Sequence, residues 1–172
     1  EIKDTFEGNI TIGKALNSAI GDLLNDPETK WANDIVISIH KAILAENREL
    51  FVPLLQLVVL LDDKDVVEHL YRKKLSTRLT KHPDTDLENE FLTLMRKEFG
   101  FSYTNRSEVM IKDILLNESS SDTFGSSILQ YGAWPFENNF HCELPQELKQ
   151  YQDAQEQQYL TGHPNRRLSW LP

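Results

Sequence analysis

DDKDVVEHLYRKKLSTRLTK occupies residues 62–81 and predicts one long helix. The acidic residues at its start can accept the free N–H groups of a new helix and complement its dipole. Apolar residues follow at helical spacing and are expected to face inward: Val66, Val67, Leu70, Leu75 and Leu79. Basic residues are expected on the outer face: Arg72, Lys73, Lys74, Arg78 and Lys81. The step His82-Pro83 ends the helix, because a proline disfavours the helical conformation of the residue before it.

The same apolar periodicity continues on both sides of this helix. It predicts further helices over residues 15–24, 34–43, 49–61, 85–99 and 107–115. Gly100 is a good C-terminal stop for one of them. Residues 1–118 are therefore expected to form a helical bundle, with a domain boundary in the polar, serine-rich stretch that follows.

The pattern changes after this boundary. Residues 124–134 predict a strand, Pro145 can open a helix, and residues 167–170 alternate polar and apolar side chains as a strand does. Residues 119–172 are then expected to form a small α/β part that is incomplete, because two short strands leave open sheet edges. The expected fold class is mainly α with a small α+β part, whose partial mixed sheet is completed by missing segments or by a partner strand.

Composition excludes several classes of protein. The 172 residues carry a formal net charge of -9, with 18 basic against 27 acidic residues, so binding of nucleic acid through overall charge is not expected. The longest apolar run, residues 51–61, is too short to span a bilayer. The single cysteine cannot form an internal disulfide, which fits a reducing compartment. The lack of an initiator methionine suggests a piece of a longer chain.

Catalytic motifs are absent from the sequence: it has no phosphate loop, no dinucleotide turn and no His-Glu-x-x-His. His141 and Cys142 are adjacent, so on a strand they point to opposite faces, and a structural thiol is favoured over a nucleophile. The acidic clusters at residues 62–65 and 84–88 are better explained by helix capping than by a cation. We expect no catalytic residue, no metal site and no cofactor.

Two features point instead to protein partners. The five basic residues of residues 72–81 form either a solvated helix face or a landing patch for an acidic partner. Trp134-Pro135-Phe136 and Trp170 either anchor the small sheet on the helices or mark an open sheet edge that a partner strand pairs with.

Motifs in a fixed order along the chain resemble the cullin family. They are Asp63-Lys64-Asp65-Val66 followed by Tyr71 and Leu75-Ser76-Thr77-Arg78-Leu79, then Glu98-Phe99-Gly100-Phe101-Ser102-Tyr103-Thr104, then Met110-x-x-Asp113-Ile114, then Ile128-Leu129 through Trp134-Pro135-Phe136 and Leu144-Pro145-Gln146-Glu147-Leu148, and last His163 to Trp170. Val67, Ser76-Thr77 and Asn165 depart from the usual family residues, and the stretch 117–125 is shorter than in typical cullins.

The resemblance implies a non-catalytic scaffold subunit of a multisubunit RING ubiquitin ligase, located in the cytoplasm and nucleus. Its partners would be a RING-box protein, a ubiquitin-conjugating enzyme and, through an N-terminal region absent here, substrate-receptor adaptors. The RING-box strand would pair near Leu129, Tyr131, Trp134, Leu168 and Trp170. Cullins carry a basic groove, called the canyon, that receives the acidic tail of the conjugating enzyme. Arg78 and Lys81 are at positions where cullins have canyon residues, so the five basic residues would form this groove.

Two alternatives remain at this level. The chain could be the cullin-like subunit of the anaphase-promoting complex, which shares the domain. It could instead be a non-ligase helical interaction module, which would fold as a monomer without a partner strand.

Overall fold

The computed structural model describes residues 10–81, 85–118, 127–136 and 144–170. The chain divides into two compact units, Glu1–Pro135 and Phe136–Pro172, which are described separately. The first unit contains α2 (Ile10–Leu24), α3 (Trp31–Leu44), the short 3-10 helix η1 (Arg48–Leu50), α4 (Phe51–Leu60), α5 (Lys64–Lys81), α6 (Asp86–Phe99) and α7 (Phe101–Glu118). The second contains α8 (Gln146–Gly162). The predicted helical character is confirmed.

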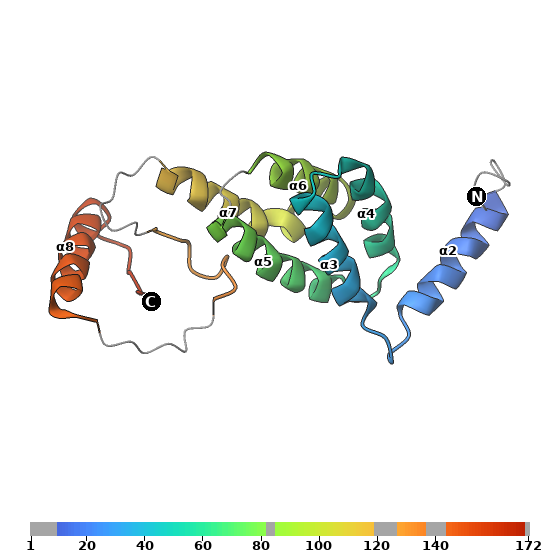
Figure 1. Ribbon diagram of the computed structural model, residues 1–172, viewed down its shortest axis with the longest axis horizontal. Helices are drawn as coiled ribbons and strands as arrows, with labels where there is room; N and C mark the ends of the chain where they lie inside the picture. Colours follow the sequence, from blue (N-terminus) through green and yellow to red (C-terminus); the bar gives the residue numbers. More distant parts are fainter. Residues whose placement is uncertain (1–9, 82–84, 119–126, 137–143, 171–172) are drawn as a thin grey trace. The chain divides into compact units, whose positions relative to one another are not determined.

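Helix α5 lies at the centre of the first unit, packed against α3, α4 and α7, while α6 packs against α7 and α4 (Figure 1). The core residues of α5 are almost fully buried: Val67, Tyr71, Leu75 and Leu79. Phe91 of α6 contacts two aromatic rings, Phe51 at 5.2 Å and Tyr71 at 5.7 Å between ring centroids. Val66, expected inside, is 47% exposed, because it lies one position off the buried stripe.

Local signals explain where the helices begin and end. Pro53 lies in the first turn of α4, where its missing N–H has no intrahelical partner to lose. Gly100 ends α6 at φ 86°, a left-handed conformation that glycine adopts without strain. Asn25 joins the end of α2 to the end of α4, since its amide donates to Leu60 O at 3.0 Å and accepts from Asp62 N at 2.9 Å.

Helix α7 is longer than predicted, because it begins at Phe101 and not at Ser107. Its first turn is held by tertiary contacts: the ring of Tyr103 lies 4.8 Å from that of Phe99, and its hydroxyl donates to Lys64 O at 2.9 Å. The first compact unit also includes residues 127–135, beyond the boundary predicted after residue 118. That domain boundary stays a prediction.

The described residues contain no strand, so the strands expected over 124–134 and 167–170 are not formed there. A strand requires a neighbour to complete its ladder of hydrogen bonds. Residues 127–130 instead bond to side chains of α7, and residues 166–170 are irregular. The mixed sheet stays a prediction that depends on further chain.

In the second unit, residues after α8 fold back on that helix. Trp170 Nε1 donates to Glu156 at 3.2 Å, Arg166 donates to the Tyr159 hydroxyl at 2.7 Å, and His163 stacks on Tyr159 at 4.4 Å. None of the described residues in this unit is buried. Among the helices of the described part, none combines the length and apolar character needed to cross a membrane.

Candidate interaction surface

The basic residues of α5 divide into a buried and an exposed group. Arg72 is only 7% exposed and Arg78 only 4%, whereas Lys73 and Lys81 are exposed and Lys74 is half-buried. The prediction that all five lie on an outer face is therefore wrong for the two arginines. The reason is that α3, α4 and α7 surround α5, so that little of its circumference faces solvent.

Arg78 is held in a buried polar cluster between α3, α5 and α6. Its guanidinium pairs with the Glu88 carboxylate, with Nη2 at 2.9 Å from Oε2, and the Tyr71 hydroxyl donates to the same oxygen at 3.2 Å. Arg78 Nη1 donates to His40 Nδ1 at 3.0 Å. Glu88 was expected to help cap α6, but its carboxylate is the counter-ion of a buried arginine.

The environment shifts the pKa of Tyr71, Arg78 and His40 in this cluster. Burial and the nearby Glu88 charge raise the pKa of Tyr71 well above its ordinary value, so the phenol stays a donor. Burial is the largest influence on the pKa of Arg78 and lowers it, but the hydrogen bonds and charges of Glu88 and Tyr71 together raise that pKa by more, so it lies above its ordinary value. Burial, followed by the Arg78 and Lys74 charges, lowers the pKa of His40, which therefore accepts at Nδ1 as a neutral ring.

His40 should make the stability of the helical unit sensitive to mild acid. Its folded-state pKa lies below 6.5, so the unfolded chain takes up a proton first as the pH falls through 6.5. The contribution of His40 to the free energy of unfolding is fully present above pH 6.5 and is lost as the pH falls toward the folded-state pKa. The urea midpoint should drop less between pH 7.5 and 5.5 in His40→Gln than in the wild type. His69→Gln, at an exposed position of α5, is the control and should keep the wild-type dependence.

Arg72 connects α5 to the segment that carries Trp134. Its Nε lies 2.9 Å from Glu68 Oε1, and its Nη1 donates to Ala133 O at 2.8 Å and to Gly132 O at 3.5 Å. The turn needs glycine at 132, where φ is 84°. Arg72 therefore fixes the Gly132 turn and is not available to an external partner.

Asp113 and Asn117 of α7 hold the same segment from another side, and we call this pair the α7 clamp. Asp113 Oδ2 accepts from Gln130 N at 2.7 Å and from Trp134 Nε1 at 2.9 Å. The Asn117 side chain accepts from Ile128 N at 2.8 Å and donates to Ile128 O at 2.9 Å. The α7 clamp was not predicted from the sequence. Two signals were available: Asp113 is part of the Met-x-x-Asp-Ile motif, and Asn117 is at position i+4 from it, on the same face of the helix.

The residues predicted for a partner strand have different environments. Trp134 is 7% exposed and is an anchor of the helical unit, whereas Tyr131 is 84% exposed. The Leu129 side chain packs against the core. Leu168 and Trp170 belong to the second unit, where both are half-buried.

Lys73 and Lys74 border a groove of about 440 Å³. Its lining residues come from α3, α5 and the end of the Trp134 segment: Asn33, Leu70, Lys73, Lys74, Ser76, Thr77 and Pro135. Salt bridges between described residues include none from Lys73, Lys74 or Lys81. This part of the predicted basic patch is available to an acidic surface.

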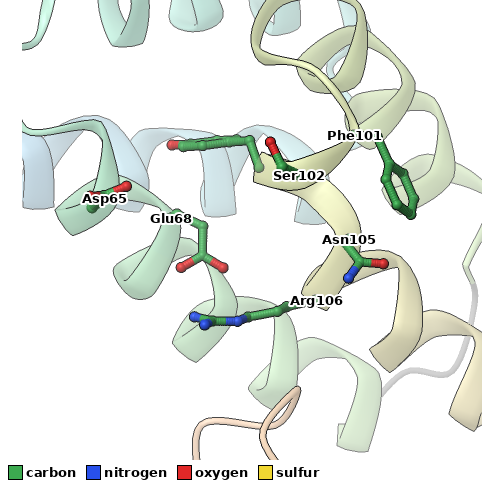
Figure 2. A pocket seen from close by; sticks show the side chains of 7 residues that line it. Asp65, Glu68, Phe101, Ser102, Asn105 and Arg106 are labelled. Atoms are coloured by element: carbon green, nitrogen blue, oxygen red, sulfur yellow. The ribbon is translucent and has the colours of Figure 1, made fainter.

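A second pocket, of about 500 Å³, lies where the first turns of α7 face the start of α5 (Figure 2). Figure 2 shows Arg106 extending from α7 toward Glu68, while Phe101 points away from Asp65. Burial, with the charges of Glu68 and Asp65, raises the pKa of Tyr103 here. The pocket mixes both signs of charge and does not select one class of ligand.

Other predicted groups contribute nothing to these surfaces. His141 and Cys142 lie outside the described residues, as does Asp84. In the part of the chain that the structure describes, no three His, Cys, Asp or Glu side chains gather as a metal site would require.

Comparisons with known proteins agree with the motif series. A family model for the cullin alpha solenoid domain matches residues 2–121. Cullin-1 of Schizosaccharomyces pombe is 25% identical over 99% of the chain and 26% of that protein. Cullin-3B of Arabidopsis thaliana is 27% identical over 98% of the chain and 26% of that protein, and Cullin-4 of Dictyostelium discoideum is 30% identical over 62% and 15%. The chain spans about a quarter of the length of the curated relatives that it matches throughout.

Proposed function

This chain belongs to the cullin family, and we propose that it is part of a non-catalytic scaffold subunit of a cullin-RING ubiquitin ligase. The observation that carries the proposal is the match to cullins along 99% of the chain, together with surfaces suited to protein partners. The matched relatives named Cullin-1, Cullin-3 and Cullin-4 favour this assignment over a subunit of the anaphase-promoting complex. A location in the cytoplasm and nucleus is part of the proposal.

The RING-box protein is the first proposed partner. Two observations support it. The second unit buries none of its described residues, so it lacks a core of its own there. The segment 127–131 carries an exposed Tyr131 and backbone groups with no partner strand. Leu129, Tyr131, Leu168 and Trp170 remain the proposed contacts, while Trp134 anchors Leu129 and Tyr131 on the helical unit.

Coexpression of the full-length protein with a RING-box protein tests this assignment. We expect the two chains to elute together from size-exclusion chromatography as a stoichiometric complex. Full-length protein that stays monomeric when coexpressed would contradict the scaffold proposal and would favour a helical module of another kind.

The ubiquitin-conjugating enzyme is the second proposed partner. Lys73, Lys74 and Lys81 would receive its acidic surface, and the groove beside Pro135 adds polar contacts. Arg72 and Arg78 are removed from this role, because their guanidinium groups are buried and bonded within the unit. Exposed charges of this kind raise the rate of association more than the affinity, and salt screens them.

Reversing Lys73, Lys74 and Lys81 to Glu together should slow ubiquitin transfer about tenfold at low salt, because steering by complementary charge is lost. The difference should shrink at 0.5 M salt, since screening is then nearly complete. Single-turnover transfer assays on the full complex measure both. The control reverses Lys41, Lys97 and Lys112, which are exposed on other helices and give the same change in net charge. Equal rates for the two triple variants would refute the role of this patch.

A further inference from the structure

The backbone of residues 127–131 has two edges with different neighbours. Asn117 bonds both the N–H and the C=O of Ile128, and Asp113 bonds the N–H of Gln130. Bonded groups two residues apart that face one helix have the spacing of an extended chain. The α7 clamp therefore occupies one edge of this segment, as a neighbouring strand would.

Leu129 lies between these two bonded residues, and its backbone is directed to the other edge. Successive residues of an extended chain point their N–H and C=O groups to opposite sides. No hydrogen bond joins the Leu129 N–H or C=O to another described residue, although Leu129 itself packs against the core. Ile128 and Tyr131 expose their side chains, 46% and 84% respectively, beside this unused pair of groups.

The turn after residue 130 limits how far a partner strand can extend. Gln130 O accepts from Ala133 N at 3.2 Å, and Arg72 fixes the following carbonyl groups. Backbone pairing on the open edge must therefore end near Tyr131. Leu129 is the one residue between the two clamped positions that offers both a donor and an acceptor to an extended chain.

We propose that Asp113 and Asn117 are positioning residues that block the edge facing α7 and leave Leu129 as the hydrogen-bonding residue for the incoming RING-box strand. The inference rests on the proposed function and adds the edge and the register of pairing. The α7 clamp holds the segment extended before the partner arrives, so binding does not have to order it. A strand that pairs one residue out of register would meet groups that α7 already bonds.

Residue-resolved hydrogen exchange on the full-length protein, free and in complex with the RING-box protein, tests this register. In the free protein the Ile128 and Gln130 amides should exchange slowly and the Leu129 amide quickly. Complex formation should slow the Leu129 amide by at least about 100-fold and change its two neighbours by less than about tenfold. An intact complex in which Leu129 still exchanges quickly, or in which Ile128 loses protection, would overturn the inference and leave the proposed function standing.

Asn117→Ala provides an independent measurement. Losing two hydrogen bonds that pre-order the strand should weaken RING-box binding about tenfold, since binding must then order the segment as well. Asn117→Asp keeps an acceptor for Ile128 N and should fall between Ala and wild type. Asn105→Ala, an exposed asparagine on the same helix, should bind as the wild type does. Equal affinity for the Asn117 and Asn105 variants would refute the positioning role, whereas wild-type protein that forms no complex would overturn both proposals.

Discussion

Glu88→Ala should reduce the free energy of unfolding of the helical unit by about 3–5 kcal/mol, because it leaves the buried Arg78 charge without its counter-ion. Arg78 is 4% exposed and Glu88 2%, so water cannot replace the lost carboxylate. The Tyr71 hydroxyl loses its acceptor in the same change. Urea unfolding of the wild type and the variant, followed by circular dichroism, measures the difference.

Glu90→Ala is the matched control, two residues along α6 from Glu88. Glu90 pairs with Arg48 on the surface, where the two side chains are 45% and 56% exposed. Exposed pairs contribute about 0–1 kcal/mol. Replacing both members of the buried pair, as Arg78→Met with Glu88→Leu, should cost less than Glu88→Ala alone, since no charge is then left unpaired. A Glu88→Ala variant as stable as Glu90→Ala would contradict the buried ion pair.

Trp134→Ala should lower the free energy of unfolding by about 3 kcal/mol, as expected for a large aromatic side chain removed from a buried site. The indole fills space in the core and donates to Asp113, so both packing and a hydrogen bond are lost. Because Trp134 anchors residues 127–135 on the helices, binding of the RING-box protein should weaken as well. Urea unfolding and a binding titration on the full-length protein measure the two effects.

Two further substitutions separate the causes. Trp134→Phe retains most of the apolar volume and removes the donor, so it should cost about 1 kcal/mol. Tyr131→Ala removes an aromatic side chain that is 84% exposed and should change stability by less than about 0.5 kcal/mol. If Trp134→Ala were as stable as Tyr131→Ala, the anchoring role of Trp134 would be wrong.

The buried arginines change how the basic helix should be tested. Reversing Arg78 to Glu would place two carboxylates together in the core. A slower ubiquitin transfer in the assay of that variant would then reflect unfolding and not the loss of a contact with a partner. None of the salt bridges between described residues involves Lys73, Lys74 or Lys81, so reversing these lysines leaves the Arg78–Glu88 pair in place. The lysines are therefore the residues of this helix to reverse when the proposed contact with an acidic partner is tested.

Hydrophobic periodicity located the helices of the first unit, although it predicted the start of α7 at Ser107 and not at Phe101. The spacing of Leu75 and Leu79 predicted the inner face of α5, and the two are 0% and 2% exposed. Gly100 ended α6 at the predicted residue. Signals of this kind are local, because each depends on residues within one or two turns of the same helix. The resemblance to cullins was equally visible in the sequence, and the family model over residues 2–121 confirms membership of that family.

Tertiary structure alone decided which charged residues are available. Arg78 and Lys81 look alike in sequence, but Glu88 from α6 and His40 from α3 surround only the arginine. The partners Asp113 and Trp134 come together across 21 residues of sequence. The sequence by itself determined the helices and the family, since hydrophobic spacing and short motifs along the chain are enough to recognise both. The buried charges and the open edge at Leu129 depend on which distant elements pack against each face, and no local pattern carries that information.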